Sequence, residues 1–128
     1  MISNEMFREF IEADLRRFTE EIDNVIYHLD GPGELKHLDT ILQFPKLKAV
    51  QWVPGAGAPD QSQWPEVYQK IHKAGKYIQV WDGYDCIRAV EQQIGTSAGI
   101  HQMSVTGNGR KEDREYHIRN LRDLGVIE

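Results

Sequence analysis

The apolar residues of this 128-residue chain alternate between the spacing of strands and the spacing of helices. Short runs rich in β-branched and aromatic residues predict strands at about 25–29, 48–53, 76–81 and 99–105. A glycine-bearing loop follows each run, and apolar residues at helical spacing come next. Those segments predict helices at about 34–43, 63–74, 85–94 and 111–124, and a further helix at 3–21 precedes the first strand.

Four strand–loop–helix units in succession predict an α/β fold with a parallel sheet and right-handed crossovers. The length favours a single domain over residues 1–128. The helix at 3–21 carries an apolar stripe that is typical of core packing: Phe7, Phe10, Ile11, Leu15, Phe18 and Ile22. His37 lies one position off the apolar face of the helix at 34–43, which favours a surface or boundary position.

Alternate positions along the four strands differ in polarity. Residues i and i+2 of a strand point to the same side, so each strand has two sides. In these four strands the residues of one side are mostly apolar. The other collects the more polar set, which is His28, Asp30, Gln51, Gln79, Trp81, Gln102 and Ser104. A sheet covered by helices on both faces would be apolar on both. The pattern therefore favours helices on one face and a polar face that lines a cavity, as in half of a (βα)8 barrel. The alternative is a flavodoxin-like open sheet with glutamines at its strand ends.

The first strand ends in His28 and Asp30 and is followed by Gly31-Pro32-Gly33. Parallel α/β folds place their chemistry at the carboxyl ends of strands, so these side chains are candidates for a site. An aspartate beside a histidine favours the imidazolium form and can orient the ring. The alternative is a polar strand end that only solvates a turn.

Charge and composition narrow the partners to small molecules and other proteins. The net charge is −5 and no basic run occurs, which argues against nucleic acid as a partner. No apolar segment approaches the roughly 18 residues needed to span a membrane. The N-terminus lacks the layout of a signal peptide, which predicts a cytoplasmic protein. The single cysteine, Cys86, excludes an internal disulfide and any zinc site built from several cysteines.

Several segments resemble the uroporphyrinogen decarboxylase superfamily, and most closely the branch that includes corrinoid-linked and coenzyme M methyltransferases. They are Tyr27–Gly33 (YHLDGPG), Gln51–Gly55 (QWVPG), Ala74-Gly75-Lys76 and the opening Met6–Phe10 (MFREF). The resemblance covers most of the chain and is strongest over residues 3–81. It implies that the chain corresponds to the C-terminal half of a (βα)8 barrel. The barrel would then be completed by a missing N-terminal half or by a second copy in a homodimer.

The resemblance also implies an activity, which is methyl transfer linked to a thiol acceptor or to a corrinoid carried by a partner protein. The alternatives are a decarboxylase acting on a porphyrinogen-type substrate and a half-barrel that binds a small ligand, or is structural, without catalysis. His28 and Asp30 would be catalytic. The residues expected to bind substrate are Gln51, Trp52, Gln79, Trp81 and Gln102.

The methyltransferase branch holds zinc through a His-x-Cys-Gly strand end. His28 matches the histidine of that motif, and Asp30 stands where the cysteine would be. A carboxylate can also bind zinc, so His28 and Asp30 are the candidate metal ligands as well. The chain has no clear counterpart of the family's distal cysteine ligand.

Overall fold

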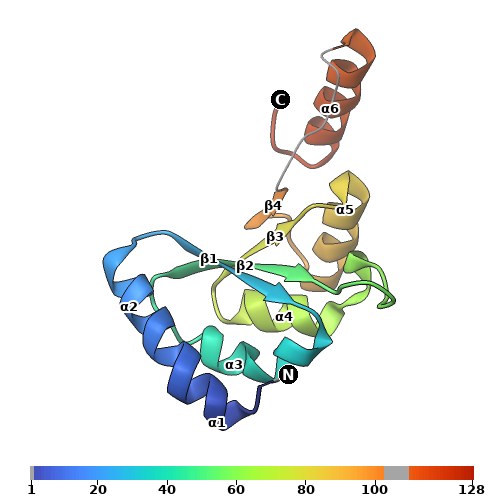
Figure 1. Cartoon of the computed structure of the whole chain (residues 1–128). Helices are drawn as coiled ribbons and strands as arrows, with labels where there is room; N and C mark the ends of the chain where they lie inside the picture. The colour runs from blue at the N-terminus through green and yellow to red at the C-terminus, as the bar shows by residue number, and fades with distance from the viewer. Residues whose placement is uncertain (1, 103–109) are drawn as a thin grey trace.

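The described part of the chain forms one sheet of four parallel strands in chain order, β1-β2-β3-β4 (Figure 1). They are β1 (Val25–Asp30), β2 (Leu47–Val53), β3 (Tyr77–Val80) and β4 (Ile100–Gln102). The computed structural model describes residues 2–102 and 110–128. The predicted α/β fold with a parallel sheet is confirmed. Because each strand lies beside the next one in the chain, crossovers of one hand place their helices on the same face. A doubly wound sheet would instead reverse its strand order.

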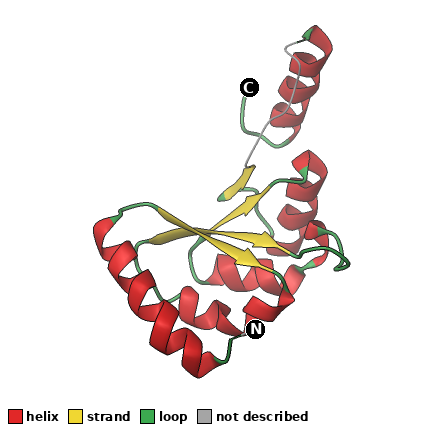
Figure 2. Ribbon diagram, in the orientation of Figure 1, coloured by secondary structure: helices red, strands yellow, loops and turns green. Residues whose placement is uncertain are grey.

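The helices alternate with these strands. They are α1 (Asn4–Met6), a π-helical turn (Phe7–Glu12), α2 (Ala13–Glu21), a 3-10 segment (Pro32–His37), α3 (Leu38–Ile41), a 3-10 turn (Gln61–Gln63), α4 (Pro65–Lys73), α5 (Gly83–Ile94) and α6 (Lys111–Asp123). Figure 2 shows α3, α4 and α5 on one side of the sheet. None of the helices in the two described ranges is long and apolar enough to cross a bilayer.

We call the two sides of the sheet the covered face and the open face. The covered face is lined by side chains that are at most 1% exposed: Leu29, Val50, Trp52, Ile78 and Val80. They pack against apolar residues of the helices, including Ile41 of α3 and Ile71 of α4. The open face carries the alternate positions, where Ile26 and Tyr77 are half exposed. The hydrophobic core therefore lies between the sheet and a single layer of helices.

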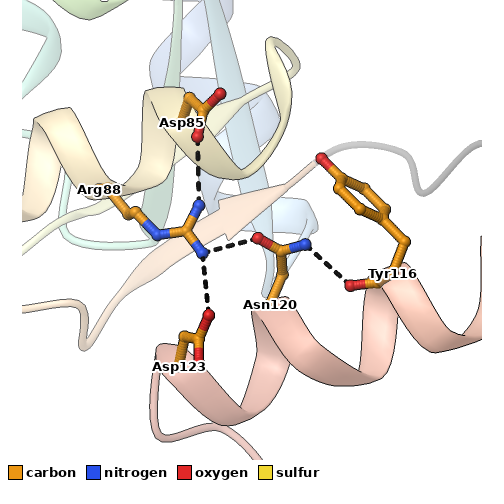
Figure 3. A network of polar contacts seen from close by, with 5 residues as sticks. All are labelled: Asp85, Arg88, Tyr116, Asn120 and Asp123. Carbon is orange, nitrogen blue, oxygen red and sulfur yellow. Dashed lines mark hydrogen bonds and ion pairs between the residues drawn. The ribbon is translucent and has the colours of Figure 1, made fainter.

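The C-terminal helix α6 is joined to α5 by a polar network centred on Arg88 (Figure 3). One guanidinium nitrogen donates to the Asn120 side-chain oxygen at 2.6 Å and lies 3.7 Å from Asp123. Another nitrogen donates to Asp85 at 3.2 Å. Asn120 is buried and donates in turn to the carbonyl of Tyr116 at 2.8 Å. Leu121 and Leu124 of α6 pack beside this network against the core, so α6 continues the helical layer beyond α5.

The first helix packs differently from the prediction. Phe7 is buried, but Phe10, Phe18 and Ile22 are 57%, 50% and 49% exposed, so the stripe as a whole is not core. The π-helical turn Phe7–Glu12 has more residues per turn than an α-helix. This difference in spacing takes the later apolar residues off the side on which Phe7 packs.

His37 also lies elsewhere than its spacing indicated. It is 4% exposed, and its ring stacks on Phe7 with centroids 4.1 Å apart and planes 9° from parallel. The segment Pro32–His37 is a 3-10 helix, in which successive residues turn through a larger angle than in an α-helix. The face expected for an α-helix is therefore rotated, and His37 joins the N-terminal segment to the helical layer.

Candidate functional site

A row of polar side chains crosses all four strands on the open face. The parallel register aligns His28 with Gln51, Gln51 with Gln79, and Gln79 with His101. Aligned residues of neighbouring strands share a face, so the four side chains belong to one surface. We call this set the His28–His101 row.

Two hydrogen bonds fix the orientation of the Gln51 side-chain amide in the row. The Gln51 amide nitrogen donates to the Gln79 side-chain oxygen at 2.9 Å, so the Gln51 oxygen faces the other way, toward His28. That oxygen lies 2.5 Å from His28 Nδ1. An amide oxygen can only accept, so Nδ1 carries the proton. In the neutral ring, Nε2 is then the nitrogen that can accept a proton.

Gln51 holds the row in place from a nearly buried position, at 7% exposure. A buried amide without partners would cost about 1–3 kcal/mol, which its two hydrogen bonds along the row offset. The amide orients the imidazole of His28 without adding a negative charge beside it. Gln51 is therefore a positioning residue, and His28 is the titratable member of the row that it orients.

The register of the fourth strand differs from the alignment that the sequence predicted. The register pairs Gln102 with Val80, which belongs to the covered face, and pairs His101 with Gln79. His101 rather than Gln102 therefore aligns with the row, because a shift of one residue in register exchanges the two faces of a strand. His101 was thereby missed, although it is one position away in the sequence. Ser104, placed with this set by the sequence, lies outside the described residues.

Asp30 does not pair with His28. Its side chain is exposed and makes no hydrogen bond or ion pair with any described residue, while its backbone N–H donates to the Glu34 carboxylate at 3.1 Å. The expected orienting partner of His28 is thus replaced by Gln51. Among the described residues, no group of three His, Cys, Asp or Glu side chains could hold a metal ion. A zinc site on His28 and Asp30 would need further ligands from another chain.

The two tryptophans predicted to bind substrate lie in different environments. Trp52 is fully buried on the covered face and packs edge-on against Trp64, with centroids 5.0 Å apart. It cannot contact a ligand on the open face, so its predicted role is wrong. The alternation of polarity along the strand predicted an apolar-side position for Trp52, whereas the family resemblance implied a substrate-binding role. The burial of Trp52 agrees with the apolar-side position. Trp81 is 39% exposed and, with Asp60 and Asp82, lines a hollow of about 350 Å³ at the carboxyl ends of β2 and β3.

Gln61, to which the sequence drew no attention, supports this end of the sheet. It is 2% exposed; its amide nitrogen donates to the Trp52 carbonyl at 2.5 Å and its oxygen accepts from the Trp81 N–H at 3.1 Å. Tyr68 donates to its carbonyl at 2.5 Å. Gln61 therefore ties the loop after β2 to the end of β3. A glutamine in a loop gives no sequence signal of such a role.

Cys86 is buried on α5 near Gln61. Burial, and after it the charge of Asp82, raises the pKa of the Cys86 thiol to about 12. A thiol that stays protonated at neutral pH is a poor nucleophile and metal ligand. Cys86 therefore serves as a small buried apolar residue of the core.

The fold and the site together define a one-sided parallel α/β sheet whose open face carries an imidazole–amide row. Comparison with known proteins finds no family model, curated protein or solved structure that matches this chain.

Proposed function

We propose that the chain is the C-terminal half of a (βα)8-type enzyme and that its open face is one wall of the barrel lumen. The observation that carries the proposal is the His28–His101 row, which spans all four strands on the face that the described helices leave uncovered. The family resemblance of the sequence supports the same reading.

Exposed apolar side chains on the open face and on the first helix support a missing cover. Ile26 and Tyr77 on the face, and Phe10 and Phe18 on the first helix, are each about half exposed. Where such side chains form a contiguous surface, that surface is typical of sites that bind another protein. The cover would be an N-terminal half-barrel or a second copy of this chain.

The reaction that we propose is methyl transfer to a thiol. Nε2 of His28 would accept the thiol proton while Gln51 holds Nδ1. The thiolate sulfur would then bond to the methyl carbon as the bond between that carbon and its donor breaks. A corrinoid carried by a partner protein would supply the methyl group. The described residues of this chain offer His28 and Asp30 toward zinc but no third ligand, so no step is assigned to a metal.

The test combines assembly and turnover. We expect the purified chain to form a dimer, or to form a stable complex when the N-terminal half is supplied, as measured by size-exclusion chromatography with light scattering. The assembled protein should catalyse methyl transfer from methylcobalamin to coenzyme M, followed by absorbance. His28→Ala should lower this rate by about 10²–10⁴-fold, the usual contribution of a general base.

His72→Ala is the matched control, because His72 is an exposed histidine on α4. It should leave the rate unchanged, and both variants should unfold near the wild-type temperature. A monomeric chain without turnover would contradict the proposal, as would equal rates in the two variants. Binding of a small ligand without turnover would favour a non-catalytic module instead.

A further inference from the structure

A groove of about 480 Å³ lies on the open face beside the His28–His101 row, at the end where the strands begin. Its lining includes Ile26, Lys48, Ala49, Tyr77, Gln79 and His101. Cavities of this size accommodate small organic ligands. Gln79 and His101 belong to the row as well, so the groove and the row are continuous.

Lys48 enters the groove because of an irregularity in β2. The register pairs Val25 with Leu47 but Ile26 with Ala49, so Lys48 is an extra residue, as in a β-bulge. Strict alternation would turn Lys48 toward the covered face, with Val50. A bulge re-aims the side chain, and bulges are common next to functional sites. Here Lys48 and its neighbour Ala49 both line the groove.

Two polar side chains of the groove lining, Lys48 and Gln79, present hydrogen-bond donors to it. Lys48 makes no ion pair with any described residue, whereas Lys46 nearby is 3.1 Å from Asp23. Gln79 uses its side-chain oxygen to accept from Gln51, so it presents its amide N–H groups. The groove lining contains no Asp or Glu, although the chain as a whole carries a net charge of −5. An anionic acceptor is therefore the complementary ligand group.

The groove also has an apolar wall, in which Tyr77 is held in place. The Tyr77 ring lies against His101, with centroids 5.2 Å apart. Gly99 also lies close to this ring, because a Cβ atom there would come within 2.9 Å of it. The aromatic ring thus rests on a position that admits no side chain. With Ile26 and Ala49 it forms an apolar surface suited to a flat or aliphatic ligand body.

We propose that this groove binds a small carboxylate with an apolar body, and that Lys48 is the counter-ion of the carboxylate. The apolar body lies on Ile26, Ala49 and Tyr77, and Gln79 donates a hydrogen bond to the carboxylate. A single lysine with one amide suits a carboxylate better than a phosphate, which is usually held by several backbone and side-chain donors. The inference goes beyond the proposed methyl transfer and does not depend on it.

The test titrates the full chain with 2-naphthoate, using 2-naphthalenemethanol as the uncharged probe of the same shape. Binding is followed by NMR chemical shifts of the Gln79 side-chain amide and of the Tyr77 and His101 backbone amides. We expect a dissociation constant of roughly 1 mM or tighter for the carboxylate, given its size. The alcohol should bind at least about fivefold more weakly, because it lacks the charge that Lys48 recognises.

Lys48→Met keeps the length of the side chain and removes its charge. It should weaken naphthoate binding by about tenfold, the usual worth of one charge-assisted hydrogen bond, and leave the alcohol unchanged. Lys48→Arg should retain binding. Lys73→Met, an exposed lysine on α4, is the matched control and should have no effect.

Several results would overturn the inference. They are no shift change up to 5 mM naphthoate, equal binding of acid and alcohol, an unchanged affinity in Lys48→Met, or shifts confined to residues outside the groove. His28→Ala separates this inference from the proposed function. It should abolish methyl transfer and leave naphthoate binding intact, so either proposal can fail while the other holds.

Discussion

The covered and open faces of the sheet come from the same strands and differ in almost every other respect. In β2, Val50 and Trp52 point into the core and are fully buried, while Gln51 between them joins the His28–His101 row. Tightly packed apolar atoms on one face stabilise the fold. Hydrogen-bonded polar groups on the other leave His28 and Lys48 directed toward solvent-accessible space. The comparison shows that neighbouring positions of one strand have different tasks. Residues on one side stabilise the core, and residues on the other side provide the candidate chemistry.

The largest expected effect on stability comes from a substitution on the covered face. Trp52→Ala should lower the free energy of unfolding by about 3–5 kcal/mol, because it leaves a large cavity between the sheet and α4. Urea denaturation followed by circular dichroism measures this loss. Trp52→Phe is the control and should cost much less, because the indole Nε1 is buried without a hydrogen-bond partner among the described residues. Similar losses for the two variants would show that packing at Trp52 is not what the covered face depends on.

A smaller effect is expected where the open face begins. Gly99 has a φ of +84°, and an added Cβ would lie 2.9 Å from the Tyr77 ring. Gly99→Ala should therefore lower the free energy of unfolding by about 1–3 kcal/mol through backbone strain. It should also displace Tyr77 and weaken naphthoate binding. Gly57→Ala is the matched control, because its φ is +80° but its Cβ would meet nothing within 4 Å. Gly57→Ala should show the same backbone strain as a lower free energy of unfolding, and it should leave the naphthoate affinity unchanged.

The smallest effect concerns His37, a polar ring enclosed in the helical layer. Burial, followed by the charge of Lys36, lowers the pKa of His37 below its usual 6.5. The unfolded chain then binds the proton more readily, so stability increases with pH. The contribution is complete above about pH 6.5 and is lost as the pH falls through 6.5 toward the lowered pKa of the folded state.

His37→Phe should retain the stacking on Phe7 and reduce the difference between urea midpoints at pH 8 and pH 5. His72→Gln, at an exposed position of α4, should leave that difference as it is in the wild type. If His37→Phe kept the full wild-type dependence on pH, the charged form of His37 would not be disfavoured in the folded protein. The helical layer would then be more open to water around His37 than its 4% exposure indicates.

Much of the architecture was predictable because it depends on local periodicity. The order of strands and helices, the parallel sheet and the apolar side formed by Leu29, Val50 and Ile78 all follow from spacing along the chain. Helix faces were less predictable. The exposure of Phe18 and the burial of His37 depend on π and 3-10 turns, which the spacing of a regular helix does not reveal.

The sequence by itself determined that the strands would have one apolar and one polar side, and it identified His28, Gln51 and Gln79, because alternation is a property of a single strand. Tertiary structure decided what those residues meet. Register placed His101 rather than Gln102 at the end of the row, a bulge turned Lys48 into the groove, and Gln51 took the place expected for Asp30. Each of these outcomes depends on how one strand is aligned with the next, and the spacing within a strand carries no information about that alignment.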